Sequence, residues 1–550
     1  MSSKSLVWLF FVALIIGGTA AGIYINETSA SKGTAANETT ANETVQEATG
    51  GANQQMNHSS HGTAVTDSAG TMGEMASPSP SPAPEAAAEP VQEKAAVLPQ
   101  PKAGQPVKGF TLTAMESNLE LSPGVTQAVW TYNGTVPGQE IRVTQGDFVR
   151  VTLKNELQVP VTIHWHGYSV PAGMDGVPGL TQDAVQPGET YTYGFSADVA
   201  GTYWYHSHQE SSVQVDKGLY GALIVEPKQS EQPDKDYTLI LDEWMKEGGD
   251  AHGAHGSGSM SEDEMMASMY NIYTVNGKSG SSITALETKL GDTVRLRLIN
   301  AGYLAHGIHI PGEFRVVSTD GQEIAEPAVL KDQVVTIAPG ERYDIELKIN
   351  SLKDFTIDAH DDNKYNDQLV IPVKVSGSKG EALEVQHDSL TDFDLYHYGK
   401  PAESDLSKVQ KFALEYTAVL NSRVDGNGQV YTINDKVFSE LPALQVKTGD
   451  YVKLTFENKS TVDHPMHVHG HFFQVLEING VKVESTIMKD TIRVKPGDKI
   501  VVAFKADNPG NWMIHCHELH HAAGGMAQQL TYTDYQSGYA SPSNAANKPE

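Results

Sequence analysis

The chain contains GDFVRVTLKN at residues 146–155, and this stretch returns twice, as GDTVRLRLIN at 291–300 and as GDYVKLTFEN at 449–458. The copies begin 145 and 158 residues apart. Self-similarity at a roughly constant spacing indicates repeated structural units. The sequence therefore predicts three similar, consecutive domains.

A second landmark keeps step with the first. It reads PGE at 187–189, PGE at 339–341 and PGD at 496–498, and each copy leads into an alternating run of apolar residues. The runs are short, rich in Val, Ile, Thr and Tyr, and broken by Gly, Pro and Asn, which is typical of a β-sandwich. Each repeat is close to 150 residues, which is long enough for its own hydrophobic core. The expected fold class is all-β.

The only cysteine lies in HCHELHH at residues 515–521, and Met526 follows five residues later. If 511–518 is a strand, alternation places the thiol on one face and the two flanking imidazoles on the other, so one strand contacts two metal centres. A thiolate, two imidazoles and a weak thioether form a blue-copper site, and Cys516, His521 and Met526 supply three of these four ligands. The alternative is a buried, inert cysteine, which the other histidine clusters disfavour.

Histidines form three further clusters, HWHG at 164–167, HSH at 206–208 and HPMHVHGH at 464–471. Each contains an His-x-His pair, and a strand points both imidazoles of such a pair to the same side. With the pair that flanks the cysteine, the four pairs supply eight imidazoles. Eight is the number that three clustered coppers need if one takes two ligands and the others take three each. His464 is left over and becomes the second histidine of the blue-copper site.

These four segments, in this order, resemble the signature of the multicopper oxidases, the family of laccases, ascorbate oxidase and bacterial cuprous oxidases. The resemblance implies three cupredoxin-like Greek-key β-sandwich domains and four copper ions. It implies a type 1 copper on His464, Cys516 and His521 with Met526 axial, a type 2 copper on His164 and His467, and a type 3 pair on His166, His206, His208, His469, His515 and His517.

The ligands are unevenly distributed over the repeats. The predicted domains are 106–228, 236–400 and 408–536. In the middle repeat, His306, His309 and a single His360 stand where the other repeats have His-x-His pairs, and we expect them to be core or surface histidines rather than ligands. The middle domain is thus predicted to lack copper and to act as a spacer. The trinuclear cluster is predicted at the contact between the first and third domains.

Two segments precede the repeats. Residues 6–25 carry no charge, and such a run is long for a signal-peptide core and just long enough for a transmembrane helix. Residues 1–25 are therefore predicted to be either a signal peptide or a membrane anchor. Residues 26–105 are Ser, Thr, Ala, Glu, Gln and Pro with hardly an aromatic, a composition that predicts a disordered linker. The protein is expected to be exported, extracellular or at the cell surface, and 537–550 is expected to be a tail.

The charge balance of 39 basic against 68 acidic residues gives a net charge of −29. Such a charge argues against a nucleic-acid partner, because the phosphate backbone requires a basic surface. Since three domains build the whole site within one chain, we expect a monomer.

The resemblance implies an enzyme that couples one-electron oxidation of phenols or aromatic amines to the four-electron reduction of O2 to water. Cys516 is expected to accept electrons, and its covalent neighbours His515 and His517 to deliver them. Relatives commonly place an aspartate after the first histidine cluster, so Asp175 is expected to orient water at the type 2 copper. The alternative for this residue is an ordinary Asp-Gly turn. Glu518 is a nearby carboxylate whose direction the sequence does not reveal.

The reductant has a second interpretation. Residues 252–269 are rich in His and Met, and thioethers favour Cu(I), which suggests a cuprous oxidase in copper homeostasis. The alternative is that 262–270 forms a short helix whose methionines pack on a neighbour. Two other classes fit less well. A copper-storage protein would need only the His and Met segments, and a copper nitrite reductase has two domains and no trinuclear cluster.

Overall fold

The computed structural model describes residues 98–230, 232–245, 262–361, 364–383, 390–426, 428–540 and 546–550. The predicted apolar segment 6–25 and the linker up to residue 97 lie outside these ranges, as does the first part of the His- and Met-rich segment, residues 252–261. Within the described ranges, no helix is both long enough and apolar enough to cross a membrane.

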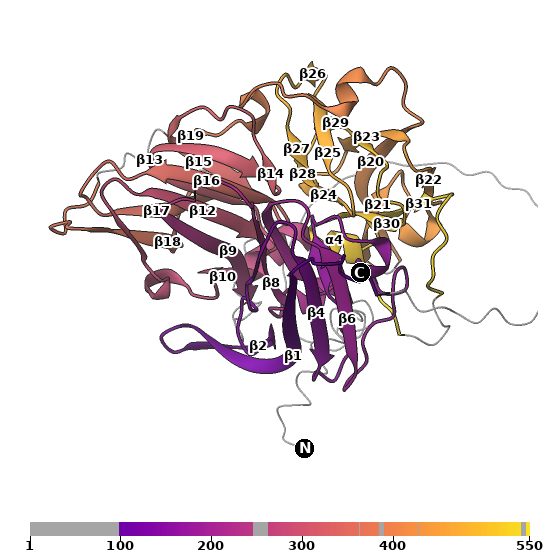
Figure 1. Cartoon of the computed structure of the whole chain (residues 1–550), viewed down its shortest axis with the longest axis horizontal. Coiled ribbons are helices and arrows are strands. Elements are labelled where there is room, and N and C mark those ends of the chain that lie inside the picture. The colour runs from indigo at the N-terminus through magenta and orange to yellow at the C-terminus, as the bar shows by residue number, and fades with distance from the viewer. Residues whose placement is uncertain are drawn as a thin grey trace, which may run out of the picture. The chain divides into compact units, whose positions relative to one another are not determined.

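The first repeat folds into two four-stranded sheets (Figure 1). One has the order β2 (Val125–Tyr132), β1 (Val107–Ser122), β4 (Phe148–Asn155), β6 (Thr190–Ser196). The other has the order β3 (Ile141–Thr144), β8 (Tyr220–Glu226), β7 (Gly201–His206), β5 (His164–His166). The 3-10 helix η1 (Ala172–Met174) and the short helix α2 (Ser211–Gln214) lie in the connections between strands.

The middle repeat forms one hydrogen-bonded path of strands. Its order is β10 (Tyr270–Val275), β9 (Lys235–Met245), β12 (Thr293–Asn300), β16 (Arg342–Lys348), β13 (His306–Thr319), β17 (Phe355–Asp361), β18 (Lys364–Ser376), β11 (Leu286–Lys289). Off this path, β14 (Gln322–Glu323) and β15 (Leu330–Ile337) pair with β13, and β19 (Thr391–Asp392) pairs with β15. Helix α3 (Glu262–Met269) leads directly into β10.

The third repeat again has two sheets, shown in orange and yellow in Figure 1. The first has the order β21 (Gly428–Ile433), β20 (Leu414–Asp425), β23 (Tyr451–Asn458), β29 (Lys499–Lys505), β25 (Phe473–Ile478), β26 (Val481–Lys482), with β27 (Met488–Lys489) on β25. The second has the order β22 (Leu444–Val446), β31 (Ala527–Tyr532), β30 (Asn511–Cys516), β24 (His464–Val468), β28 (Thr491–Val494). Helix α4 (Leu519–Ala523) follows β30.

The repeated stretch occupies the same place in all three units. It forms β4, β12 and β23, and each of these strands has one parallel and one antiparallel neighbour. The parallel partners are β1, β9 and β20. The antiparallel partners are β6, β16 and β29. Sequence self-similarity therefore reports a repeated position in the sheet.

The two landmarks are hydrogen-bonded to each other in every repeat. The glycine of the Pro-Gly turn donates its N–H to the carbonyl of the asparagine that ends the first landmark. The pairs are Gly188–Asn155, Gly340–Asn300 and Gly497–Asn458, at 2.8, 2.9 and 3.1 Å. Each glycine has φ near +82°, a backbone conformation that disfavours other residues. This hydrogen bond explains why the two landmarks recur together in each repeat.

Apolar side chains of the strands form the core. One buried cluster fills the first repeat, and a second runs continuously through the middle and third repeats. A third cluster joins strands of the first and middle repeats, with Trp204 and Trp244, to Leu519 of helix α4 in the third repeat. The prediction of an all-β fold is confirmed.

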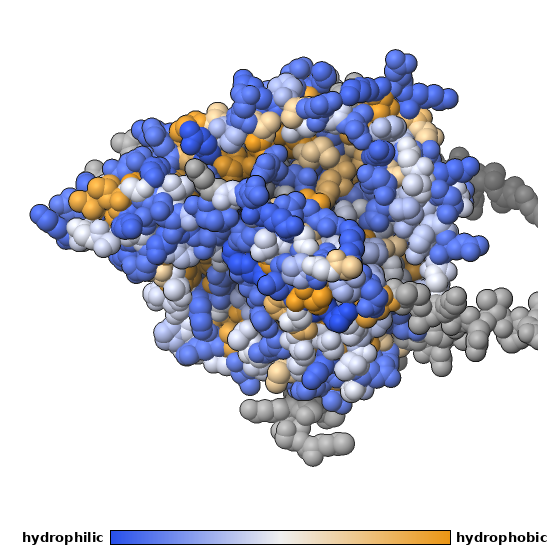
Figure 2. Space-filling model, in the orientation of Figure 1, coloured by the Kyte–Doolittle hydropathy of each residue, from blue (hydrophilic) through white to orange (hydrophobic). Residues whose placement is uncertain are grey.

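The surface shown in Figure 2 is dominated by hydrophilic residues, with small separated apolar areas. This distribution agrees with the strongly acidic composition of the chain.

Candidate metal centre

The cysteine site lies at the end of β30. Cys516 Sγ is 3.7 Å from His464 Nδ1 and 3.7 Å from His521 Nδ1, and the two Nδ1 atoms are 3.1 Å apart. All three side chains are buried. Met526 is also buried, and its backbone carbonyl accepts the Cys516 N–H at 3.0 Å, which holds the two residues side by side. The structure therefore brings the four residues of the predicted type 1 site to one place.

The eight histidines of the His-x-His pairs meet between the first and third repeats. In the first repeat, β5 and β7 pair with His164 opposite His206. In the third, β24 and β30 pair with His467 opposite His515, which places Met466 opposite Cys516. This register turns the flanking histidines of β30 away from the thiol, toward the first repeat.

The eight imidazoles form three groups, with His166 shared by two of them, and the nitrogen atoms within each group lie within 4.8 Å of one another. The groups are His164, His166, His467; His166, His206, His517; and His208, His469, His515. Each group combines side chains of the first and third repeats. The latter two groups together contain the six predicted type 3 ligands, and the first contains both predicted type 2 ligands.

The donor set fits a soft transition metal. Burial, reinforced by neighbouring imidazoles, holds the pKa of His206, His469 and His517 well below the usual range, so these rings are neutral ligands. The Nε2 atoms of His164, His206 and His467 are buried without a hydrogen-bond partner. Buried lone pairs without a partner are costly unless something else satisfies them. A metal that prefers imidazole and thiolate, such as copper, satisfies them.

Asp175 lies against two of these histidines from different repeats. Its carbonyl accepts from His164 Nδ1 at 2.8 Å, and its Oδ2 accepts from His469 Nδ1 at 2.9 Å. The carboxylate is buried, with Oδ1 3.3 Å from His164 Nδ1. Both contacts use the nitrogen that faces away from the group, which fixes the ring and frees the opposite nitrogen for a metal.

Asp490 makes an equivalent pair of contacts, and the sequence did not reveal it. Its carbonyl accepts from His467 Nδ1 at 3.0 Å, and its Oδ1 is 3.3 Å from His166 Nε2. Burial alone raises the pKa of this carboxyl, but the Arg342 guanidinium outweighs burial and holds it well below the usual range. Asp490 belongs to no motif, so only its spatial partners identify it.

The C-terminal residues, predicted to be a tail, reach the same cluster. The Pro549 carbonyl accepts from His208 Nδ1 at 2.6 Å, and Glu550 Oε1 is 3.2 Å from His208 Nε2. The Ser211 hydroxyl donates to Glu550 Oε2 at 2.5 Å. Burial raises the pKa of Glu550 to about 8. No sequence signal pointed to this contact.

Carboxylates also surround the outer edge of the cysteine site. Glu518 caps α4 by accepting the backbone N–H groups of His520 and His521, and its Oε2 is 2.8 Å from His521 Nε2. Asp263, at the start of α3, has Oδ1 3.4 Å from the same nitrogen. The Tyr431 ring lies 4.0 Å from the His521 ring, and its hydroxyl donates to Asp263. Glu518 therefore faces the cysteine site, which is the predicted type 1 site.

The histidines of the middle repeat are buried and paired with carboxylates. His306 Nε2 is 3.0 Å from Glu243, and both His309 Nδ1 and His360 Nε2 lie within 3.1 Å of Asp358 Oδ1. They are core histidines with acidic partners.

Two histidines next to predicted ligands have other partners. His471 bonds to the His469 carbonyl at 2.9 Å and to the Tyr532 hydroxyl at 2.6 Å. His520 lies 3.4 Å from Asp216.

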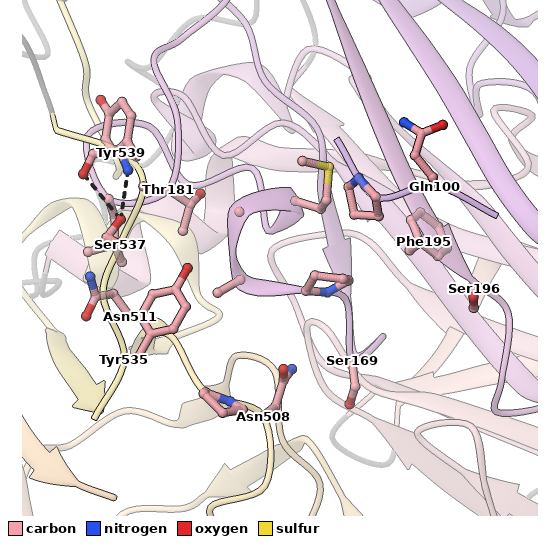
Figure 3. Close-up of a pocket in the computed structure, with 18 of the residues that line it drawn as sticks. Gln100, Ser169, Thr181, Phe195, Ser196, Asn508, Asn511, Tyr535, Ser537 and Tyr539 are labelled. Carbon is pink, nitrogen blue, oxygen red and sulfur yellow. Dashed lines mark hydrogen bonds between the residues drawn. The ribbon is translucent and has the colours of Figure 1, made fainter. Parts of the chain in front are cut away.

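A cavity of about 680 Å³ opens between the first and third repeats. In Figure 3, Phe195 and Ser169 come from the first repeat, Tyr535 and Asn508 from the third, and Ser537 from the segment that follows it. Met174, which precedes Asp175 in the chain, is part of its wall.

Comparisons with known proteins agree with this architecture. Family models of multicopper oxidases match residues 113–230, 235–375 and 407–536. The chain is 30% identical over 477 residues to Multicopper oxidase MmcO of Mycobacterium tuberculosis, covering 80% of this chain and 89% of that protein.

Two solved structures are also similar. The multi-copper oxidase from Pseudomonas thermotolerans shares 29% identity at a TM-score of 0.62, over 78% of this chain and all of its own. The multicopper oxidase from Campylobacter jejuni, described as a metallo-oxidase, shares 25% at a TM-score of 0.59, over 80% of this chain and 94% of its own.

Three β-sandwiches, a cysteine–histidine site in the last and a histidine cluster between the first and last define a cupredoxin-fold oxidoreductase that binds copper. The chain belongs to the multicopper oxidase family. The predicted family, fold class and enzyme class are confirmed. Multicopper oxidases use O2 and a reducing substrate.

Proposed function

We propose that the chain holds four coppers with the ligand sets expected from its sequence. The type 1 ligands are His464, Cys516, His521 and Met526; the type 2 ligands are His164 and His467; the type 3 ligands are His166, His206, His208, His469, His515 and His517. The observation that carries the proposal is the division of eight buried imidazoles into three mixed groups beside the cysteine site.

Copper, when bound, supplies the one-electron redox chemistry and the reduction of O2. The chain supplies the connection between the two sites, because Cys516 is covalently linked to His515 and His517. It also excludes water, since all eight imidazoles are buried. Asp175 fixes His164 and His469, and its buried carboxylate is placed to orient water beside the type 2 ligands.

The ligand assignment is tested by measuring copper content, the blue absorption of the type 1 site and the electron paramagnetic resonance of the type 2 site. His467→Ala should lose the type 2 signal and keep the blue colour, because its imidazole belongs to a histidine group and not to the group that contains the thiol. Cys516→Ser should lose the blue colour and keep the type 2 signal. A wild-type protein that binds fewer than four coppers at saturation contradicts the assignment.

The substrate side of the type 1 site favours a small cationic reductant over a bulky phenol. His521 is 3% exposed, and Asp263 and Tyr431 cover its outer edge. Two carboxylates within 3.4 Å of its Nε2 form an acidic environment that attracts cations. The same helix that carries Asp263 carries Met265, Met266 and Met269, and thioethers suit Cu(I). The Campylobacter jejuni relative is described as a metallo-oxidase.

Oxygen uptake with Cu(I) and with a methoxyphenol separates the two reductants. Met265→Leu/Met266→Leu/Met269→Leu should lower turnover of Cu(I) and leave that of the phenol unchanged, because leucine keeps the bulk and removes the sulfur. Met115→Leu, a partly buried methionine in β1, is the matched control. Equal turnover of Cu(I) by the wild-type protein and the triple variant supports the laccase-like interpretation instead.

Export and membrane attachment rest on the uncharged run at residues 6–25. Separation of membrane, soluble and extracellular fractions, with sequencing of the N-terminus, distinguishes a retained anchor from a cleaved signal. Sedimentation of the purified protein tests whether it is a monomer.

A further inference from the structure

The middle repeat, predicted to be a spacer, packs directly against the histidine cluster. Its Pro-Gly turn brings Gly340 so close that a Cβ there would lie 2.8 Å from the His517 ring and 3.2 Å from the His166 ring. The next strand, β16, begins at Arg342. The landmark that repeats along the chain is therefore, in the middle copy, a wall of the cluster.

Arg342 connects all three repeats. Its side chain is fully buried, and its Nη1 and Nη2 bind the two carboxylate oxygens of Asp490 at 2.7 and 2.6 Å. Nη1 also donates to the Gly340 carbonyl at 3.1 Å, and Nε to the Thr202 carbonyl of the first repeat at 3.2 Å. Such a planar, bidentate arrangement fixes a carboxylate in one orientation.

The carboxylate held in this way contacts histidines of both outer repeats. Asp490 accepts from His467 Nδ1 through its carbonyl and lies 3.3 Å from His166 Nε2 through Oδ1. The neighbouring Thr491 hydroxyl is 3.1 Å from each of the same two nitrogens. These contacts use one nitrogen of each ring, His467 Nδ1 and His166 Nε2. The other two nitrogens, His467 Nε2 and His166 Nδ1, have no hydrogen-bond partner and remain free.

A second residue of the middle repeat anchors the same segment. Asp320 accepts the backbone N–H of Thr491 at 3.2 Å and of Arg342 at 2.9 Å, and binds Lys489 Nζ at 3.0 Å. Two side chains of the middle repeat, the acidic Asp320 and the basic Arg342, therefore hold residues 489–491. The contacts of Asp320 with this segment are with the Lys489 ammonium and the backbone N–H groups of Asp490 and Thr491, and none of them is with an imidazole.

Asp175 makes the corresponding contacts from the first repeat, with His164 through its carbonyl and His469 through its carboxylate. The two aspartates therefore hold four imidazoles in a symmetrical way. They differ in what holds the aspartate side chain itself, because the Arg342 guanidinium neutralises and orients Asp490.

We propose that Arg342 is a positioning residue: through Asp490 it sets the rings of His467 and His166, so the middle repeat is part of the trinuclear site rather than a spacer. The proposal rests on the copper ligands proposed above. It predicts that a change at Arg342 alters the type 2 site specifically, beyond any effect on folding.

The test compares two buried arginines of the middle repeat. Arg342→Lys keeps the charge and loses the bidentate geometry. Arg297→Lys does the same at an arginine that is 2% exposed and binds Asp236, Asp344 and the Thr202 hydroxyl. Both copper-loaded variants are measured for copper content, blue absorption, type 2 paramagnetic resonance and kcat, and both copper-free variants for thermal unfolding.

Arg342→Lys should change the type 2 hyperfine splitting and lower kcat by about 10-fold or more, the usual effect of removing a residue that supports a metal ligand. Blue absorption should be unchanged, because residues other than Arg342 and Asp490 hold the cysteine site. Arg297→Lys should keep the wild-type type 2 spectrum even where it unfolds at a lower temperature. An unchanged spectrum in Arg342→Lys, or the same change in both variants, overturns the proposal.

If Arg342→Lys does not fold, the Asp320→Asn variant tests the proposal instead. This substitution loosens residues 489–491 and removes no contact with an imidazole. It should shift the type 2 spectrum in the same direction, and a wild-type spectrum would overturn the proposal. Failure of the ligand assignment is distinguishable, because it would appear in the wild-type protein as a missing type 2 signal.

Discussion

The Asp175 carbonyl holds the His164 imidazole, and its carboxylate holds the His469 imidazole and lies 3.3 Å from His164 Nδ1, so truncation keeps only the backbone bond to His164. Asp175→Ala should therefore leave His164 in place and free the His469 ring. We expect kcat with O2 to fall about 10- to 100-fold, with blue absorption unchanged. Steady-state oxygen uptake measures this, with the exposed Asp198→Ala in the same repeat as the control. A kcat equal to that of the wild-type protein would contradict this role and favour the alternative that Asp175 is an ordinary turn residue.

Gly176 completes that turn and has little room for a side chain. Its φ is +81°, and an added Cβ would overlap the Ile163 carbonyl, next to His164. Gly124 has a φ of +78° and nothing within 4 Å of its added Cβ. Gly176→Ala should therefore lower the free energy of unfolding by clearly more than Gly124→Ala, in which only the backbone strain of about 1 kcal/mol acts. Chemical unfolding of the copper-free proteins compares the two, and equal losses would contradict the steric argument.

The sequence identified residues that sit in local motifs and missed those that act through space. Cys516 and the His-x-His pairs are adjacent along the chain, so strand alternation predicts how they share a site. Asp490, Arg342 and Glu550 stand in no such motif, because the contacts Arg342–Asp490, His166–Asp490 and His208–Glu550 each join residues more than a hundred positions apart. The direction of Glu518 was equally hidden, since it depends on where β30 ends and α4 begins.

At the scale of elements, the C-terminal segment 546–550 covers the His208 side of the cluster. Besides Pro549 and Glu550, Lys548 contributes backbone bonds to Gln209 and Glu210. Deleting these residues should expose His208 and speed the release of copper to a chelator by about 10-fold, while the blue site is retained. Lys548→Ala is the control, because its ammonium pairs with the half-buried Glu210 side chain at the surface. Equal release rates would show that the segment does not protect the cluster.

The repeated elements show what self-similarity can reveal. The pattern at 146–155 and its copies predicted three similar units, and the structure gives each copy the same two strand partners. The pattern did not show that the terminal asparagine is bonded to the later Pro-Gly turn, because that bond joins residues at least 30 apart. Nor did it place α3 over His521, since helix α3 precedes β10 of the middle repeat and contacts the third.

At the scale of the whole molecule, the two kinds of copper site should affect stability differently. All the proposed type 1 ligands come from the third repeat, whereas each of the three histidine groups joins the first repeat to the third. A ligand that binds only the folded state stabilises it, by about 4 kcal/mol at a free concentration a thousand times its Kd. Copper in the histidine cluster should therefore stabilise the association of the outer repeats as well as each fold.

Removal and return of copper tests this difference by calorimetry. The wild-type unfolding temperature should fall when copper is removed and recover when it is restored. Copper-loaded Cys516→Ser should keep most of that increase, because its histidine cluster is intact. His164→Ala/His206→Ala should lose most of it, although the blue site remains. If Cys516→Ser loses the whole increase, the stabilisation comes from the third repeat alone, and the cluster does not hold the outer repeats together.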